Sequence, residues 1–201
     1  DVPETIILAD GDFPSHPLAL EWLRQCPYVV CCDGAANTYI RSGRMPEAIV
    51  GDGDSLLPDI KERYASLIHS EAEQETNDLS KAFRFCLSQE RKRITIMGAT
   101  GKREDHTIGN VSLLADYMEQ AEVSMMTDYG IFVPIREDSM FESYIGQQIS
   151  VFNMNSTALS AEGLAYPLSV FTNWWQGTLN EALARHFIIR TEGKVLVFRV
   201  F

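Results

Sequence analysis

The feature that most constrains the fold is the alternation of short apolar runs with amphipathic stretches over the first two-thirds of the chain. Apolar runs with the length of buried strands occupy residues 5–10, 28–34, 48–55, 93–99 and 122–128. The helical patterns between them occupy residues 16–26, 35–43, 77–90 and 105–121. Because strands that alternate with helices form parallel sheets covered on both faces, the sequence predicts an α/β domain with a mainly parallel sheet.

The rest of the chain follows another pattern, in which short strand-like runs are separated by turn residues. The segment TEGK (191–194) predicts a hairpin between two strong strands, and residues 180–185 are compatible with a short helix. Runs of strands after an α/β block predict a separate antiparallel domain. We therefore expect an N-terminal α/β domain over residues 1–130 and a C-terminal antiparallel β-sandwich domain over residues 131–201.

The chain is acidic, with a net charge of −11 at pH 7, and nearly all of the excess of acidic over basic side chains lies in residues 1–128. Such a surface repels phosphate backbones and anionic lipids, which argues against nucleic acid and membranes as partners. The excess has two interpretations: solvated helix surface, or carboxylates gathered to bind a divalent cation.

The four cysteines show no C-x-x-C spacing, which argues against a zinc site and is typical of a reducing compartment. The sequence shows no signal peptide and no run of 18 apolar residues. These observations predict a cytoplasmic protein.

Polar motifs follow three of the predicted strands. Asp33 and Asn37 follow the second strand, and Asp52, Asp54 and Ser55 end the third. The segment GATGKREDH (98–106) follows the fourth. Since open parallel sheets bind ligands at the carboxyl ends of their strands, these motifs together predict a ligand crevice.

The segment GDGDS (51–55) indicates a magnesium site. Two carboxylates two residues apart in an extended chain, Asp52 and Asp54, point the same way, and Mg²⁺ prefers such oxygen ligands. An acidic turn is the alternative. Asp78 and Lys81, three residues apart on a helix, are either a local ion pair or a further metal carboxylate beside a phosphate-binding lysine.

The segment 98–106 has the features of a phosphate-binding loop. Gly98 and Gly101 permit a tight turn before a helix whose free N–H groups favour anions, and Lys102 and Arg103 supply positive charge. The segment is neither a Walker A loop nor a Rossmann fingerprint. In the following helix, Asp105 is expected to be an N-cap, and His106 and Asn110 share one face.

Taken in order, these motifs resemble the thiamine pyrophosphokinase family. CCDGAAN (31–37) is similar to the family's A-D-G-A/G-A-N, and GDGDS to its G-D-x-D-S. QETNDLSKA (74–82) is similar to D-x-T-D-x-x-K-A, and GATGKREDH-x-x-x-N (98–110) to G-x-x-G-G-R-x-D-H-x-x-x-N. STALSAEGLAYPL (156–168) and LNE (179–181) resemble later segments. The chain departs from the family's usual residues at Glu75 (aspartate), Asn77 (threonine), Lys102 (glycine) and Tyr166 (tryptophan).

The resemblance implies an α/β domain, a β-sandwich, and a homodimer with active sites at the subunit interface. It also implies a reaction in which ATP gives its diphosphate to the hydroxyl of thiamine, and AMP leaves. Asp52, Asp54 and Asp78 would hold Mg²⁺, with Asp33 nearby.

The same resemblance implies roles for other residues. Asp78, Arg103 and Asp105 would be catalytic; Arg103 and Lys81 would bind phosphates, and Asp105 would orient the arginine or the attacking hydroxyl. The ligand-binding residues would be Asp33, Asn37, Asp54, Ser55, Lys81, Gly98, Gly101, Lys102, His106, Asn110, Tyr166 and Asn180.

Tyr166, Trp174 and Trp175 are candidates for stacking on thiamine, with core or dimer packing as the alternative, and Asn180 is expected to reach the pyrimidine from the partner subunit. Two further functions stay open: a diphosphokinase for another hydroxymethyl heterocycle such as a pterin, and a nucleotide- or thiamine-binding sensor without turnover.

Overall fold

The computed structural model describes the whole chain, residues 1–201. The chain forms two compact units. The first comprises residues 1–112 and 120–128, and the second comprises residues 113–119 and 129–201. Each unit contains its own hydrogen-bonded strands.

The first unit is built on a parallel sheet of short, buried strands. In chain order these are β1 (Thr5–Leu8), β2 (Val29–Cys32), β3 (Ala48–Val50), β4 (Ile68–His69), β5 (Arg93–Met97) and β6 (Glu122–Met126). Their order in the sheet is β6–β5–β1–β2–β3–β4, with every neighbour parallel. Ile7 pairs with Val30 on one side and Ile96 on the other, and none of the three is exposed. Burial on both faces explains why these strands are continuous apolar runs.

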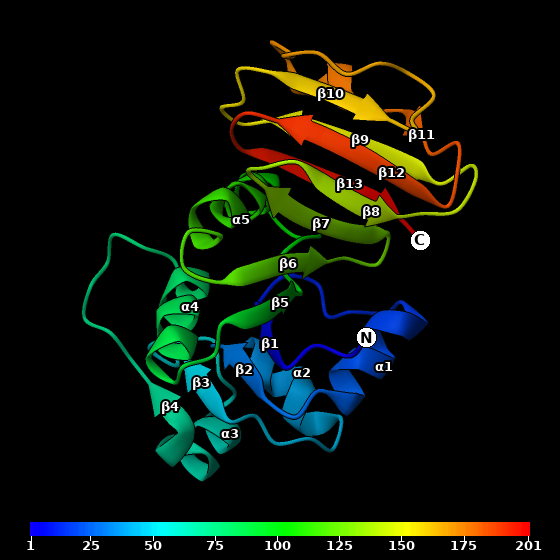
Figure 1. Cartoon of the computed structure of the whole chain (residues 1–201). Helices are drawn as coiled ribbons and strands as arrows, with labels where there is room; N and C mark the ends of the chain where they lie inside the picture. The colour runs from blue at the N-terminus through cyan, green and yellow to red at the C-terminus, as the bar shows by residue number, and fades with distance from the viewer. The chain divides into compact units, whose positions relative to one another are not determined.

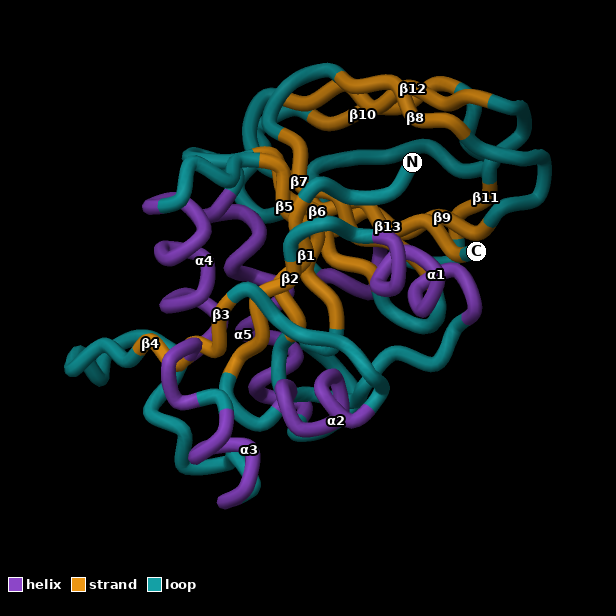
Figure 2. The backbone as a smooth tube through the Cα atoms, turned by 90° about the horizontal axis from the view of Figure 1, so that it is seen from below, coloured by secondary structure: helices purple, strands orange, loops and turns teal.

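Helices cover both faces of this sheet. They are α1 (Pro17–Gln25), α2 (Ala35–Arg41), α3 (Pro58–Arg63), α4 (Asp78–Ser88) and α5 (Glu104–Tyr117), with a 3₁₀ turn, η1, at Ala65–Leu67. Figures 1 and 2 show α1 and α2 on one face and α4 on the other. The apolar stripe of α4 is buried through Leu79, Phe83 and Cys86, as its helical spacing predicts. Two elements, α3 and β4, lie between residues 56 and 76, where the sequence pattern predicted neither a helix nor a strand.

The strand order reverses beside β1, and this reversal creates the position for a site. From β1 the chain adds β2, β3 and β4 in one direction, and then returns to place β5 and β6 on the other side of β1. In open parallel sheets, such a reversal is the usual position of a ligand crevice, at the carboxyl ends of the strands. The two loops are joined by backbone hydrogen bonds: Gly11 N–H donates to the Gly98 carbonyl at 2.7 Å, and Asp12 N–H donates to the Thr100 carbonyl at 2.9 Å.

The second unit is an antiparallel sandwich. Its strands are β7 (Gly130–Ile135), β8 (Ser139–Glu142), β9 (Gln148–Asn153), β10 (Leu159–Glu162), β11 (Asn180–Glu181), β12 (His186–Thr191) and β13 (Val195–Val200), with a 3₁₀ turn, η2, at Trp174–Gly177. One layer has the order β11–β9–β13–β7 and the other β10–β12–β8. One core joins the layers, for example through Val151 and Val197 of the first and Phe187 of the second. The predicted fold class is confirmed.

Two local predictions in this unit are wrong. TEGK does not close a hairpin, because β12 pairs with β8 and β10 whereas β13 pairs with β7 and β9. The turn carries the chain from one layer to the other, so that Phe187 and Val195 face the same core. Residues 180–185 form no helix: β11 begins the segment, and Ala182 is fully buried and forms an isolated bridge with Leu164.

None of the helices combines the length and the apolar character that crossing a bilayer requires.

The central strand β1 should dominate the stability of the first unit. We expect Ile7→Ala to lower the free energy of unfolding by about 3 kcal/mol, because Ile7 is fully buried between two strands and its loss leaves a cavity. The exposed control Leu20→Ala, on α1, should change it by less than about 0.5 kcal/mol. Urea unfolding measures both, and equal effects would contradict this arrangement of the sheet.

Candidate functional site

Acidic side chains gather where the first three strands end. β1, β2 and β3 lead into Asp10, Asp33 and Asp52, and each of these aspartates precedes a glycine. Asp78 is the first residue of α4. Asp10 is absent from the sequence-based prediction, although an apolar strand before it and a glycine after it gave the same pattern that identified Asp33.

Gly51 lets two of these carboxylates approach one point. Its φ of 139° lies in a region that favours glycine. A Cβ at this position would lie 3.1 Å from Asp78 Oδ2 and 3.2 Å from Asp33 Oδ2. The carboxylates of β2 and α4 therefore converge on the backbone that follows β3.

Asp33 is the most constrained member of the cluster. It is 5 % exposed, and its φ of 39° is in the left-handed region, which aspartate tolerates better than most residues. Its Oδ1 accepts a hydrogen bond from Ser55 N–H at 3.1 Å. Burial, followed by contact with the Asp52 carboxylate, raises the pKa of Asp33 to about 6.

The pKa of Asp52 is shifted in the opposite direction. Its Oδ1 accepts a hydrogen bond from Asp54 N–H at 3.0 Å. This bond and the contact with Asp33 lower the pKa of Asp52. The pair Asp33–Asp52 thus favours one shared proton, which is the expected response of two carboxylates placed together without a cation.

Asn37 holds the loop that carries the predicted metal ligands. Its Nδ2 donates to the Ser55 carbonyl at 2.9 Å, and its Oδ1 accepts from Leu57 N–H at 3.0 Å. Asp54 and Ser55 are exposed at the tip of this loop. Asn37 therefore positions the loop, and both of its polar atoms are used for this.

Two lysines lie beside the other two carboxylates. Burial raises the pKa of Asp10 and of Asp78; the charge of Lys102 partly offsets this at Asp10, and the charge of Lys81 does so at Asp78. Lys102 Nζ donates to the Asp10 carbonyl at 3.1 Å and lies 3.8 Å from Asp10 Oδ1. Lys81 is only 7 % exposed.

The loop between β5 and α5 supplies the second cationic group. Gly98 and Gly101 have φ values of 68° and 91°, and a Cβ at Gly98 would lie 2.7 Å from the Ala9 carbonyl oxygen, so the loop packs directly against the end of β1. Arg103 forms a two-point contact with Asp105, with Nε to Oδ1 at 3.1 Å and Nη2 to Oδ2 at 2.7 Å. Arg103 lowers the pKa of Asp105. The two-point contact with Asp105 also fixes the plane of the Arg103 guanidinium, which stays exposed.

Of the two polar residues that share a face of α5, His106 is exposed and Asn110 is held by hydrogen bonds. The backbone N–H of His106 donates to Asp105 Oδ1 at 3.0 Å. Asn110 donates from Nδ2 to the Ala99 carbonyl at 2.9 Å and accepts at Oδ1 from Asn77 Nδ2 at 3.0 Å. The expectation that Asp105 is an N-cap is wrong: α5 begins at Glu104, so Asp105 is the second residue of the helix, where its carboxylate pairs with Arg103.

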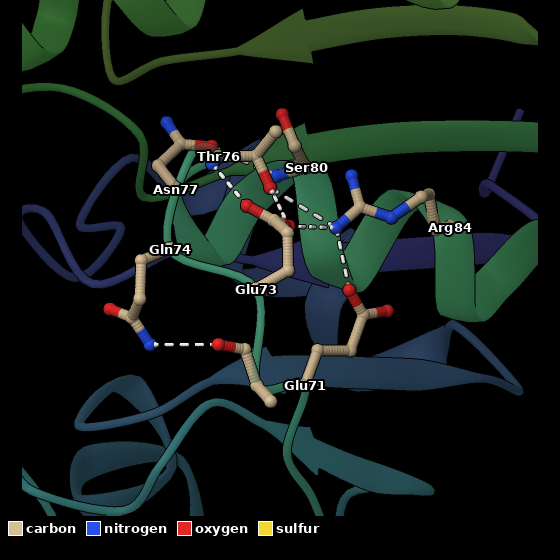
Figure 3. Close-up of polar contacts among 8 residues, drawn as sticks. Glu71, Glu73, Gln74, Thr76, Asn77, Ser80 and Arg84 are labelled. Carbon is tan, nitrogen blue, oxygen red and sulfur yellow. Dashed lines mark hydrogen bonds and ion pairs between the residues drawn. The ribbon is translucent and has the colours of Figure 1, made fainter.

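An ion-pair network holds the acidic segment that leads into α4 (Figure 3). Arg84 Nη2 contacts Glu71 at 2.6 Å, Glu73 at 2.9 Å and Thr76 Oγ1 at 3.1 Å. Glu73 also accepts from the backbone N–H and the hydroxyl of Thr76, both at 2.6 Å. Because Arg84 lies on α4 itself, the network ties residues 71–76 to the helix that they precede.

Two cavities flank the end of β1 within the first unit. One, of about 500 Å³, is lined by Asp10, Gly11, Asp12, Phe13, Asn37, Ser55 and Lys102, among others. The other, of about 530 Å³, is lined by Asp10, Gly11, Asn77, Asp78, Lys102, Arg103, Asp105, His106 and Asn110, among others. Asp10, Gly11 and Lys102 border both cavities. Half of the ten predicted ligand-binding residues of this unit therefore line one divided site, namely Asn37, Ser55, Lys102, His106 and Asn110, whereas Asp33, Asp54, Lys81, Gly98 and Gly101 do not line it.

The donor set fits magnesium in its usual protein environment. No three His, Cys, Asp or Glu side chains are close enough together to enclose an ion by themselves. Mg²⁺, however, keeps several waters and is typically bound by one or two carboxylates together with substrate phosphates. Burial, with a smaller contribution from the neighbouring carboxylates, raises the pKa of Asp33 and of Asp78, and a cation bound there would favour their charged forms.

The remaining predicted residues lie in the second unit. Tyr166, Trp174 and Trp175 are exposed there, at 62 %, 50 % and 72 %. Asn180 is buried, and its side chain binds the backbone of Tyr166: Nδ2 donates to the carbonyl at 2.9 Å and Oδ1 accepts from the N–H at 3.1 Å. Asn180 therefore fixes the segment that presents Tyr166.

Comparison with protein families gives two matches that together span most of the chain. Residues 19–126 match the family model described as the catalytic domain of thiamin pyrophosphokinase, and residues 130–198 match its substrate-binding domain. Among curated relatives, thiamine pyrophosphokinase 1 of Oryza sativa subsp. japonica is 30% identical over an alignment of 129 residues, and the match covers 52% of this chain and 49% of that protein. The Bacillus subtilis thiamine pyrophosphokinase is 34% identical over an alignment of 86 residues, and the match covers 41% of this chain and 40% of that protein. The matches thus span about half the length, or less, of these relatives.

Solved structures show the same fold. The thiamin pyrophosphokinase of Geobacillus thermodenitrificans superposes with a TM-score of 0.82 at 20% identity and covers 98% of this chain and 97% of its own. The yeast enzyme superposes with a TM-score of 0.79 at 17% identity and covers 100% of this chain and 87% of its own.

The raised pKa of Asp33 predicts a gain in stability when its charge is removed. The folded-state pKa of about 6 exceeds the unfolded value near 4, so wild-type protein loses stability as the pH rises from about 4 to about 6. In EDTA at pH 7.5, Asp33→Asn should unfold with a free energy about 1–2 kcal/mol higher than wild type, whereas at pH 4 the difference should vanish. Urea unfolding measures this.

The exposed carboxylate Glu47 offers a matched control for the Asp33 experiment. Glu47→Gln should change the free energy of unfolding by less than about 0.5 kcal/mol at both pH values. A gain for Asp33→Asn that is equal at pH 4 and pH 7.5, or no gain at all, would contradict the carboxylate cluster.

Proposed function

Because the chain belongs to the thiamin pyrophosphokinase family, we propose that it is an enzyme that transfers the diphosphate of ATP to the hydroxyl of thiamine, giving thiamine diphosphate and AMP. The observation that carries the proposal is the arrangement around the end of β1. Asp10, Asp78 and a loop with Lys102 and Arg103 line cavities of about 500 and 530 Å³ where the strand order reverses.

The reaction requires positioning and charge neutralisation rather than a covalent intermediate. The hydroxyl oxygen of thiamine forms a bond to the β-phosphorus of ATP. The bond from this phosphorus to the oxygen shared with the α-phosphate breaks, and that oxygen leaves with AMP. The hydroxyl proton is released.

The acidic cluster is the proposed magnesium site. Asp52, Asp54 and Asp78 would supply its carboxylate ligands, with Asp33 beside them, and substrate phosphates and waters would complete the coordination because the three carboxylates do not enclose an ion by themselves. When bound, Mg²⁺ offsets the negative charge of the phosphates and of the carboxylates. Without that offset, a domain this acidic would repel ATP.

The phosphates themselves would be bound by cationic side chains. Arg103, oriented by Asp105, presents an exposed planar guanidinium suited to two-point contact with a phosphate. Lys81 and Lys102 would add positive charge beside Asp78 and Asp10. The predicted nucleotide-site residues Asn37, Ser55, Gly98, Gly101, His106 and Asn110 would shape the loops around the nucleotide.

Thiamine is a cationic aromatic molecule, so its pocket needs ring faces. The exposed rings of Tyr166, Trp174 and Trp175 in the second unit support a role in this pocket. Asn180 would act by holding the Tyr166 segment.

We also propose a homodimer with active sites at its interface. Besides the three rings, the second unit exposes Tyr144, Ile145, Val170, Leu179 and Leu183. A monomer rarely exposes so many large apolar side chains, so this surface is suited to contact with a second copy. Sedimentation equilibrium that gave the mass of one chain would contradict this. The four buried, unpaired cysteines support a reducing compartment such as the cytoplasm.

The reaction products test the proposed activity. Incubation with ATP, Mg²⁺ and thiamine should give thiamine diphosphate and AMP in equal amounts, and EDTA should abolish the reaction. ADP as the nucleotide product would exclude diphosphate transfer. AMP formation with a hydroxymethyl pterin but not with thiamine would favour a different heterocycle, and tight binding of both ligands without AMP release would favour a sensor.

The metal assignment has its own test in Asp54→Asn. Because Asp54 is exposed and holds no part of the core, the substitution should leave the melting temperature within about 2 °C of wild type. It should lower kcat by about 100-fold, because it removes a proposed magnesium ligand. Asp59→Asn, at an exposed position on α3, is the matched control and should keep full activity. Full activity in Asp54→Asn would disprove the assignment.

A further inference from the structure

Asn77, the residue before Asp78, uses both ends of its side-chain amide. Its Oδ1 accepts a hydrogen bond from Ser80 N–H at 3.0 Å and so caps α4, and Figure 3 shows it beside this first turn. Its Nδ2 donates to Asn110 Oδ1 on α5, also at 3.0 Å. The cap of one helix is therefore tied to the side of another.

Asn110 continues the connection. Its own Nδ2 donates to the Ala99 carbonyl at 2.9 Å. Ala99 belongs to the loop that runs from β5 to Arg103 and Asp105. Two side-chain amides thus form a continuous path of hydrogen bonds from the residue before Asp78 to the loop that carries Arg103.

Both ends of this path face the same cavity. Asn77, Asp78 and Asn110 line the cavity of about 530 Å³ together with Ala99, Arg103 and Asp105. Asp78 contributes a carboxylate to this lining, and Arg103, paired with Asp105, contributes a guanidinium. A ligand that carries both a divalent cation and a phosphate chain must contact both groups at once, so the spacing between them determines how well it binds.

Asparagine is suited to this position because it has a separate acceptor and donor on a long side chain. Aspartate would cap the helix equally well but has no donor. Threonine, the usual residue in the family pattern, would cap the helix through a shorter side chain, and its single hydroxyl lies closer to its own backbone. The link to Asn110 therefore depends on the residue that this chain has at position 77.

We propose that Asn77 is a positioning residue that, through Asn110, fixes the distance between Asp78 and the Arg103–Asp105 pair, and thereby makes the site selective for a magnesium-bound triphosphate over a nucleoside monophosphate. This proposal rests on the proposed function for the identity of the ligand. Neither asparagine needs to touch the reacting atoms. Their effect is on ligands that contact both ends of the cavity.

A double-mutant cycle in ligand affinity tests the proposal. The variants are Asn77→Ser, Asn110→Ala and the two combined, and the probes are magnesium with α,β-methylene ATP, and AMP alone, both by calorimetry. Each single substitution should weaken binding of the magnesium-bound analogue about tenfold, the effect of losing one hydrogen bond, and should change AMP affinity less than twofold. The double variant should also bind the magnesium-bound analogue only about tenfold more weakly than wild type, because both substitutions break the same path of hydrogen bonds.

Two results would overturn the proposal. One is an equal loss of affinity for AMP, which would indicate a general structural defect. The other is a loss of about 100-fold in the double variant, the product of independent effects. Asn77→Thr retains a good cap and is the second variant; it should behave like Asn77→Ser if the link to Asn110 matters.

Two controls distinguish the positioning role from a general loss of stability and from a failure of the proposed reaction. His16 caps α1 in the same unit through its Nδ1, so His16→Ala should lower the melting temperature and leave both affinities unchanged. Wild-type protein assayed for AMP release with thiamine tests the proposed function independently. If that assay fails while the affinity cycle shows coupling, the positioning role stands and the proposed reaction does not.

Discussion

The burial of carboxylates beside one another at the ends of the parallel strands is the constraint on which the site depends. Asp33, Asp52 and Asp78 converge near Gly51, and Asp33 responds with a pKa of about 6. Folding tolerates this because the strands behind the cluster are buried apolar runs whose packing outweighs the local cost. A site that is destabilising when empty is well prepared to bind a cation.

The topology of the sheet determines where this cluster can form and what lies opposite it. Because the strand order reverses beside β1, the loop after β5 packs against the end of β1, as the hydrogen bond from Gly11 to Gly98 shows. That loop brings Arg103 to the same crevice as the carboxylates. Opposite charges therefore face each other across a cavity large enough for phosphates.

Features that depend on neighbouring residues could be predicted from the sequence, and features that depend on distant ones could not. Apolar runs ending in Asp-Gly predicted the positions of Asp33 and Asp52, and the same rule applied to the first strand would have found Asp10. The turn at 191–194 was recognised, but the partners of the strands it joins are chosen by the common core and not by the turn. The contacts of Asn180 with Tyr166, and of Arg84 with Glu71, likewise join residues that are separated in the sequence.

We propose that burial and the neighbouring carboxylates disfavour the charged form of Asp33 and that a divalent cation reverses this effect. Titration of the Asp33 carboxyl carbon by ¹³C NMR tests this directly, in EDTA and again with magnesium and α,β-methylene ATP. We expect a pKa of about 6 in EDTA and a lower value in the complex. A pKa near 4 in both conditions would contradict it.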